Sequence, residues 1–290
     1  MYLFLTILSY IFQILPRKFA LLIGRFLGTL IYYIYPLRKS IAMKNLDIAF
    51  PEYDREKKSA ILRSCYRHFG MVLIDFLRLP KVKREKDKVV VDVPATSVEL
   101  MKSKSGGIIL TGHLGNWEYI GPMLSIHNIK SAGVALIQKN NQSDRFFNEL
   151  RISENMKVIP INSGSKVMIQ HIMEGYYLGL ISDQNAGDRG TNALFFDKSV
   201  SVPKGAAAFH LKTNTPIILG FCILSKELHY KLSFHELDLE GLPKNSNDAI
   251  VEINQRFTNV LERTVKKYPE QYFWFHRKWN REMYKGISRY

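Results

Sequence analysis

Along most of the chain, hydrophobic residues recur either in short runs typical of strands or at the spacing of a helix face. Short apolar runs predict strands at 89–93, 108–111, 133–137, 157–161, 177–182, 216–224 and 228–237. Helical periodicity predicts helices at 116–126, 143–155, 165–174, 204–212 and 248–268. Strands separated by helices indicate βαβ units, and the run at 228–237 is expected to pair antiparallel with the strand before it. We therefore expect an α/β fold with a mixed, mostly parallel sheet flanked by helices.

A longer helical pattern precedes this region. It covers 55–79 and is expected to end at Pro80. The following run KVKREKDK, residues 81–88, predicts a solvated linker or a basic loop that faces lipid.

The N-terminal segment has a different pattern, because it is almost uniformly apolar. Residues 1–16 carry no charge, Arg17 and Lys18 follow, and the stretch 19–37 is interrupted only by Arg25. Fifteen helical residues rise about 22 Å, which is less than the roughly 30 Å of a hydrocarbon core. The segment 1–37 therefore predicts a membrane anchor before a single domain at 38–290. The anchor is either one transmembrane helix with an interfacial helix or a monotopic pair, and a buried core helix pair is the alternative.

The composition and charge of the chain limit the classes of molecule that it is expected to bind. The chain of 290 residues has 41 Lys and Arg against 26 Asp and Glu, a net charge of +15, which indicates an anionic partner. Nucleic acid, acidic lipid and acidic protein all fit, but the apolar N-terminus favours the membrane surface. Basic residues interleave with aromatic ones over 263–290, although no RRM, KH or zinc-finger motif supports nucleic acid. The two cysteines, Cys65 and Cys222, cannot build a disulfide framework or a Cys-based zinc site.

The main catalytic candidate is the segment GHLGNWE, which follows an apolar strand. A carboxylate such as Glu118 can fix the tautomer of His113, so that the other ring nitrogen removes a proton from a hydroxyl. The lack of a nucleophile elbow favours direct attack by an external acceptor, without a covalent acyl-enzyme. No third ligand for zinc is evident beside the two side chains. The alternative is structural, with His113 at a strand end and Glu118 in the first turn of a helix.

The segment TGHLGNWE resembles the HX4E form of the HX4D/E motif of glycerolipid acyltransferases. The chain as a whole is similar to the late acyltransferases of lipid A biosynthesis, the lauroyl and myristoyl transferases, with which phosphatidylinositol mannoside acyltransferases are grouped. The similarity rests on Arg151 before MKVIPI, on ISDQNAGDRGTNALFFDKSVSVPKGAAAF, on TNTPII and on FWFHRKW. One departure is Asp197-Lys198, where the family usually continues Phe-Phe with Gly.

The resemblance implies a glycerol-3-phosphate acyltransferase-like fold and an O-acyltransferase without a cofactor or metal. The donor would be an acyl carrier protein or acyl-CoA, and the acceptor a hydroxyl of a lipid A precursor or similar glycolipid. A phosphatidylinositol mannoside, phospholipid or aminolipid acceptor, or a thioester hydrolase, is the alternative. The basic charge also leaves a non-enzymatic binder of membranes or nucleic acid as a remote alternative. The family also implies a place at the bacterial inner membrane, with the active site on its cytoplasmic face.

Roles for individual residues follow from this resemblance. His113 would be the general base and Glu118 its orienting carboxylate, within hydrogen-bond reach at the mouth of a long apolar pocket. Six further residues are candidates for substrate binding, each with a structural alternative: Asn116, Arg151, Asp183, Gln184, Arg189 and Lys204. The structural alternatives are a helix cap for Asn116, a surface ion pair for Arg151, and mutual pairing for Asp183 and Arg189. His276 and Arg277 are expected to be structural or interfacial.

Overall fold

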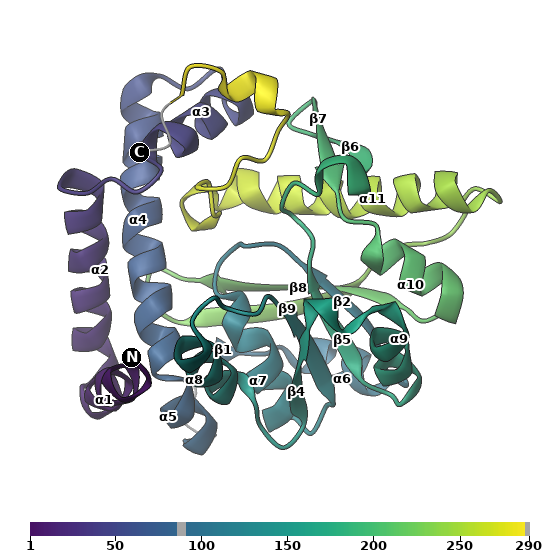
Figure 1. Ribbon diagram of the computed structural model, residues 1–290, viewed down its shortest axis with the longest axis horizontal. Helices are drawn as coiled ribbons and strands as arrows, with labels where there is room; N and C mark the ends of the chain where they lie inside the picture. Colours follow the sequence, from purple (N-terminus) through teal and green to yellow (C-terminus); the bar gives the residue numbers. More distant parts are fainter. Residues whose placement is uncertain (86–90, 288–290) are drawn as a thin grey trace.

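The computed structural model describes residues 1–85 and 91–287. Its main sheet has seven strands in the order β1-β9-β8-β2-β5-β3-β4, and all neighbours are parallel except β8 and β9 (Figure 1). This confirms the mixed, mostly parallel sheet and the antiparallel last strand. The strands are β1 Val91–Asp92, β2 Gly107–Thr111, β3 Ser131–Ala135, β4 Met156–Pro160, β5 Tyr177–Ile181, β8 Ile217–Leu224 and β9 Tyr230–Glu236. The predicted positions 89 and 90 lie outside the described residues.

Helices cover both faces of this sheet. The crossovers and the closing helix are α6 Ala95–Lys102, α7 Ile120–Ile126, α8 Asn141–Arg151, α9 Ser165–Met173, α10 Gly205–Thr213 and α11 Ser246–Lys267. The central strand β2 is buried throughout, and its residues alternate between two cores. Ile108 and Leu110 belong to the core with α9, α10 and α11, whereas Ile109 belongs to the core with α6 and α7. This alternation is the two-residue period of a strand covered on both sides.

The long helix before the sheet ends earlier than predicted. Helix α4 covers Arg55–Leu77, and a short helix α5, Leu79–Arg84, carries Pro80 in its first turn. Proline suits that position because its missing N–H would have no partner there anyway. Residues 81–84 of the expected basic loop are therefore helical, whereas 86–88 lie outside the described residues. The Nζ of Lys83 donates to the carbonyl oxygens of Leu150 and Ile152, each at 2.8 Å, which ties α5 to the end of α8.

A two-stranded hairpin lies where a polar loop is predicted. Strands β6 Thr191–Phe195 and β7 Lys198–Val202 pair antiparallel around the two-residue turn Phe196-Asp197. Both turn residues have positive φ, 51° and 57°, the geometry that a type I′ hairpin requires. Asp tolerates this left-handed conformation better than most residues with a side chain. The departure at Asp197 therefore falls where a glycine would be least strained.

The N-terminal segment forms two helices, α1 Tyr2–Ile14 and α2 Arg17–Tyr33, separated at Pro16. A third helix, α3 Lys39–Ala49, follows. Within residues 1–85 and 91–287, no helix is both long and apolar enough to cross a bilayer, unlike the single spanning helix that the sequence allowed. Helix α2 lies along α4 (Figure 1), and a Cβ added at Gly24 would lie 2.6 Å from the carbonyl oxygen of Gly70. These two backbones are therefore in direct contact.

Candidate active site

The residues of the candidate motif form a turn after β2. The N–H of Gly115 donates to the carbonyl oxygen of Gln271 at 2.9 Å, and the N–H of Asn116 donates to that of Cys222 at 2.8 Å. Gly115 has a φ of 65°, and an added Cβ would overlap the Cys222 carbonyl oxygen. Only glycine fits this position, because both the left-handed conformation and the close approach exclude a side chain.

Two further contacts hold the same turn. The N–H of Phe273 donates to the carbonyl oxygen of His113 at 2.9 Å. On the other side, Nε2 of the buried His68 on α4 lies 3.2 Å from the carbonyl oxygen of Gly115. Burial lowers the pKa of His68 to about 4, so its ring is neutral at pH 7 and donates from Nε2. The turn is thus attached to α4 as well as to the C-terminal segment.

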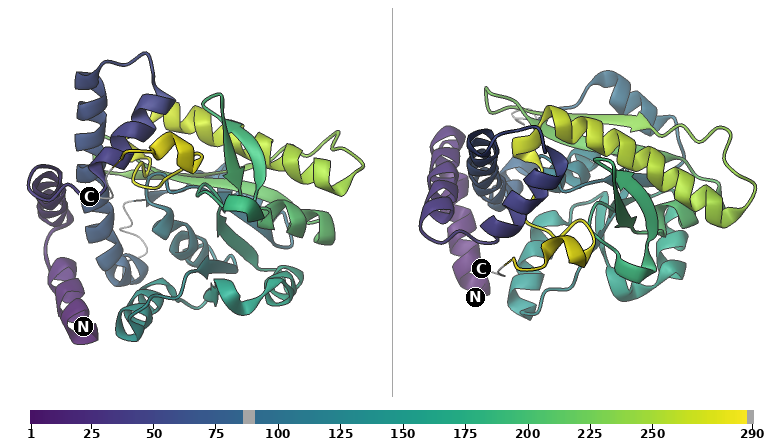
Figure 2. Two further views of the ribbon diagram at one scale, coloured as in Figure 1. Left: turned by 45° about the horizontal axis from the view of Figure 1, so that its top comes forward. Right: turned by 90° about the horizontal axis from the view of Figure 1, so that it is seen from above.

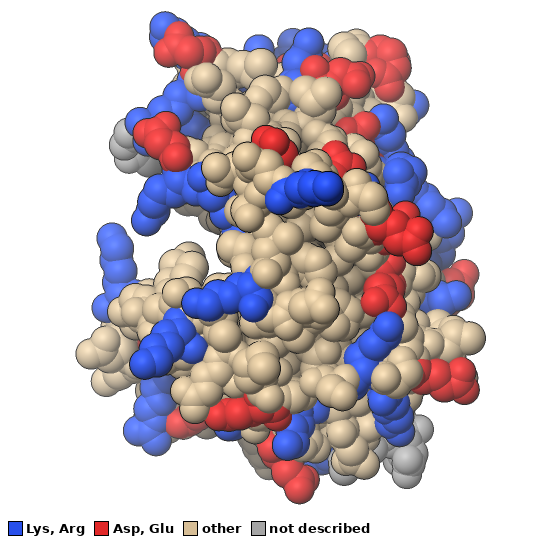
Figure 3. Space-filling view, turned by 90° about the vertical axis from the view of Figure 1, so that its right-hand side faces the viewer, with Lys and Arg blue, Asp and Glu red and all other residues tan. Residues whose placement is uncertain are grey.

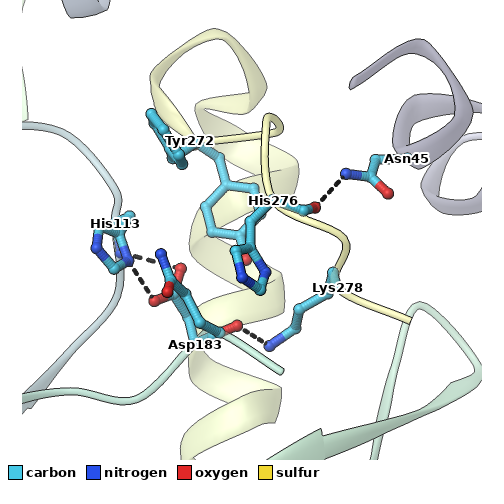
Figure 4. Close-up of a pocket in the computed structure, with 8 residues that line it drawn as sticks. Asn45, His113, Asp183, Tyr272, His276 and Lys278 are labelled. Carbon is cyan, nitrogen blue, oxygen red and sulfur yellow. Dashed lines mark hydrogen bonds and ion pairs between the residues drawn. The ribbon is translucent and has the colours of Figure 1, made fainter. Parts of the chain in front are cut away.

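The carboxylate that contacts His113 belongs to Asp183. Nδ1 of His113 lies 2.7 Å from Oδ1 of Asp183, and the N–H of His113 donates to Oδ2 at 3.0 Å (Figure 4). The two residues are 70 positions apart, but β2 and β5 are neighbouring parallel strands, and each residue follows the end of its strand. The N–H of Ser182 donates to the carbonyl oxygen of Thr111 at 3.0 Å, which continues this pairing up to the site.

Each member of this pair stabilises the charged form of the other. Burial alone would raise the pKa of Asp183, but the attraction and hydrogen bonds of His113 outweigh burial and lower it to about 2. Burial would lower the pKa of His113, yet Asp183 raises it above its ordinary value. Asp183 is therefore ionised at neutral pH and fixes Nδ1 of His113 as the protonated ring nitrogen. Nε2 of His113 meets no hydrogen-bond partner among the described residues, which leaves it free to accept a proton.

The predicted contact between His113 and Glu118 is wrong. Glu118 lies in a short 3-10 helix, η2 Trp117–Tyr119, and its carboxylate is held by Arg151 at the end of α8. Both distances, Nε to Oε2 and Nη2 to Oε1, are 2.7 Å. A planar guanidinium matches a carboxylate in this two-bond arrangement better than a single imidazole nitrogen does. The structural alternative for Arg151, an ion pair, is confirmed, although the pair is partly buried: the side chains of Arg151 and Glu118 are 21% and 15% exposed.

Some of the other predicted site residues lie near His113 and others do not. Gln184 lines a cavity with His113 and Asp183. Asn116 is the N-cap residue of η2, but it is completely buried and its side chain makes no capping hydrogen bond. Asp183 contacts His113 and not Arg189, contrary to the suggested pairing. Arg189 ends a 3-10 turn at Gly187–Arg189 and Lys204 precedes α10; neither lines that cavity.

The cavity beside His113 contains residues that were not predicted as part of the site. Its volume is about 10 Å³, close to the size of one water molecule, instead of the long apolar pocket that was expected. It is lined by Asn45, His113, Asp183, Gln184, Tyr272, Phe273, His276 and Lys278. The last four come from the segment FWFHRKW and the tyrosine before it, which sequence reasoning treated as structural. The alternation of large aromatic and basic residues there was the available signal.

Aromatic rings form an apolar wall on the other side of His113. The ring centroid of Trp117 lies 4.7 Å from that of His113, and that of Phe273 lies 5.8 Å away. Phe69 of α4 extends this cluster, 5.1 Å from Phe273. The imidazole thus lies between the buried carboxylate of Asp183 and a cluster of aromatic rings.

Among residues 1–85 and 91–287, no group of three or more His, Cys, Asp or Glu side chains is arranged to hold a metal ion. Both cysteines are buried, and burial raises the pKa of each thiol, so neither is a reactive nucleophile. The side chains present fit a general base that activates an external hydroxyl.

Comparison with known proteins shows the family of the chain. The chain matches the family described as bacterial lipid A biosynthesis acyltransferase over residues 1–281. It is similar to the lipid A biosynthesis palmitoleoyltransferase of Escherichia coli (strain K12) and to the lipid A biosynthesis acyltransferase of Shigella flexneri. Each is 21% identical over 272 residues, which cover 91% of this chain and 86% of the relative. The resemblance inferred from the motifs is confirmed.

Proposed function

This chain belongs to the family of bacterial lipid A biosynthesis acyltransferases, and we propose that it transfers a fatty acyl group from an acyl thioester to a hydroxyl of a lipid A precursor or similar glycolipid. The donor is an acyl carrier protein or acyl-CoA. The observation that carries this proposal is the His113–Asp183 pair, which leaves Nε2 available at the end of β2. The net charge of +15, with Lys and Arg on both sides of a hollow in the surface (Figure 3), favours the acidic carrier protein.

The proposed reaction proceeds by direct attack. Nε2 of neutral His113 takes the proton of the acceptor hydroxyl as its oxygen attacks the thioester carbonyl carbon. Asp183 keeps the imidazole in the correct tautomer and stabilises the imidazolium that forms. The tetrahedral intermediate then collapses, the C–S bond breaks, and the imidazolium returns the proton to the departing thiolate. The N–H groups of His113, Gly115 and Asn116 already donate to oxygens of the protein, so they are not proposed as donors to the oxyanion.

Glu118 and Arg151 have a separate role in this proposal. Glu118 orients Arg151 and does not orient His113. Since Nε and Nη2 of Arg151 are occupied by Glu118, Nη1 stays available for a phosphate or carbonyl oxygen of a substrate. Gln184, beside His113, is a second proposed substrate contact. The burial of Asn116 argues against direct contact with substrate, whereas substrate binding by Arg189 and Lys204 stays a prediction.

We also propose that the N-terminal helix pair attaches the enzyme to the cytoplasmic face of the inner membrane. Large apolar side chains of α1 and α2 point outward, among them Leu3 at 69%, Phe4 at 63%, Phe19 at 61% and Phe26 at 60% exposure. A contiguous apolar patch of this kind is unusual on a surface that faces only water. Two helices lying in the interface fit this pattern, and 1–37 remains the proposed anchor.

Product analysis tests the proposed activity. The purified protein is incubated with vesicles containing a lipid A precursor and with acyl carrier proteins loaded with different chains, palmitoleoyl included. Mass spectrometry should show the acceptor increased by the mass of one acyl group, and His113→Ala should lower the rate about 10³-fold. Release of free fatty acid without dependence on the acceptor would show a hydrolase. Equal turnover by the wild type and His113→Ala would exclude the mechanism.

A further inference from the structure

The structure contains a buried lysine directly behind the His113–Asp183 pair. Lys278 is only 4% exposed, and its ammonium donates to the main-chain carbonyl oxygen of Asp183 (Figure 4). Its Nζ also lies 5.0 Å from the ring centroid of Phe195. A buried ammonium is costly unless its interactions compensate, and lysine is therefore rarely found in this environment.

The backbone on either side of Lys278 is firmly held. Trp279 is completely buried, and its Nε1–H donates to the carbonyl oxygen of Phe195 at 3.4 Å. Nδ2 of Asn45 on α3 donates to the carbonyl oxygens of Trp274 and His276, at 2.6 and 2.7 Å. This segment lies between α3 and the β6–β7 hairpin (Figure 2, right). The fold thus fixes the position of the ammonium. Lys278 is not a surface lysine whose side chain has turned inward.

The ammonium and the imidazole use different atoms of Asp183. Nδ1 and the main-chain N–H of His113 each contact one carboxylate oxygen of Asp183. The Lys278 ammonium instead donates to the main-chain oxygen of Asp183. Lys278 therefore does not compete for the carboxylate. It restrains the peptide from which the carboxylate projects, and it brings a positive charge to the back of the pair.

We propose that Lys278 is a positioning residue of the acyltransferase site: its ammonium fixes the main chain of Asp183 so that the carboxylate faces His113, and its charge favours the neutral, proton-accepting form of that imidazole. This proposal rests on the proposed function, because it concerns the same catalytic pair.

The charges around His113 support this assignment. Burial lowers the pKa of His113, whereas Asp183 and, more weakly, Glu118 raise it, and Lys278 also lowers it. His276, from the same segment as Lys278, lines the cavity as well, and burial lowers its pKa. Burial lowers the pKa of Lys278 to about 8, so the ammonium is still protonated at pH 7. Without Lys278 only burial would oppose the two carboxylates, so more of the imidazole would be protonated at neutral pH, and a protonated imidazole cannot act as a base.

Three substitutions separate the hydrogen bond from the charge. Lys278→Arg keeps both, Lys278→Gln keeps a donor without the charge, and Lys278→Met removes both. Lys285→Met is the matched control, since Lys285 lies on the same segment, its side chain is 75% exposed and its partner is Glu282. The protonation midpoint of His113 is measured by NMR of histidine-labelled protein, with the signal assigned by its loss in His113→Gln. Thermal unfolding identifies variants that fold.

The expected result is a higher midpoint for His113 in Lys278→Gln and Lys278→Met, with Lys278→Arg and Lys285→Met close to the wild type. The acidic limb of kcat should move in the same direction, and kcat of Lys278→Met should fall by up to about 10²-fold with a smaller change in KM. A midpoint that is unchanged in Lys278→Gln would overturn the proposal, and so would wild-type kcat in Lys278→Met. If Lys278→Met does not fold, the midpoint of His113 in Lys278→Gln still tests the proposal. The titration needs no substrate, so an absence of acyl transfer by the wild type would count against the proposed function alone.

Discussion

The turn that carries His113 and the helix pair at the N-terminus are held in place by different kinds of interaction. The turn is fixed by hydrogen bonds from α4, β8 and the C-terminal segment, and Gly115 leaves no room for a side chain. Helix α2 instead rests on α4 through backbone contact at Gly24 and Gly28. One buried ion pair adds to this contact, with Nη2 of Arg17 2.8 Å from Oδ2 of Asp75.

The functional side chains of the two regions differ as well. Behind the turn, the charged groups of His113, Asp183 and Lys278 converge within a small cavity. On the helix pair most of the outward side chains are apolar, with Lys18 and Arg25 among the exceptions. Chemistry thus depends on atoms placed to within tenths of an ångström, whereas attachment depends on apolar area. We expect substitutions in the turn to affect turnover and stability together, and substitutions on the outer helix face to affect only attachment.

The largest effect on stability is expected for Gly115→Ala. The added Cβ meets the carbonyl oxygen of Cys222, and the left-handed φ of 65° adds strain, so unfolding should become easier by about 3 kcal/mol. Urea unfolding measures this change, and acyl transfer should be lost with it. Gly241→Ala is the control, because its φ is 68° but no atom lies within 4 Å of an added Cβ. Equal effects of the two substitutions would mean that close packing of the turn is unimportant.

A somewhat smaller effect on stability is expected when the pH is lowered. The pKa of Asp183 is lowered from 3.8 to about 2, so its stabilising effect is complete above its unfolded pKa and disappears as the pH falls through its folded pKa. The difference in unfolding free energy between the wild type and Asp183→Asn should therefore shrink by about 2 kcal/mol between about pH 5 and about pH 2. Urea unfolding at several pH values provides this difference. A constant difference would show that Asp183 is not stabilised as a carboxylate.

The fold was more predictable than the site. The apolar runs predict the seven strands of the main sheet, and the central strands β2 and β8 are buried almost throughout. The hairpin β6–β7 was missed, since Phe196-Asp197 lacks the glycine or asparagine that usually indicates such a turn. His113 was found from its motif. Its partner was not, because only the order of the sheet, with β5 next to β2, brings Asp183 to it. Glu118 seemed the better partner by sequence distance alone.

The smallest effect is expected on the outer face of the helix pair. Phe26→Ser removes one exposed aromatic side chain and should weaken binding to anionic vesicles by about 1 kcal/mol, or roughly fivefold. Turnover in detergent, where attachment is not required, should not change. Val251→Ser on α11 serves as the control, because Val251 is also an exposed apolar residue but lies away from the helix pair. Vesicle sedimentation gives the comparison, and an equal loss in both variants would argue against attachment through α1 and α2.

A double-mutant cycle of His113→Ala and Asp183→Asn tests most directly whether Asp183 acts through His113. The measured quantity is the single-turnover rate of acyl transfer for the wild type, both single variants and the double variant. We predict that Asp183→Asn slows the wild type by at least about 10²-fold but slows His113→Ala no further, because a carboxylate that orients the base has no effect once the base is gone. Loss of the same factor in both backgrounds, or no loss in the wild-type background, would contradict the assignment of Asp183 as the partner of the general base.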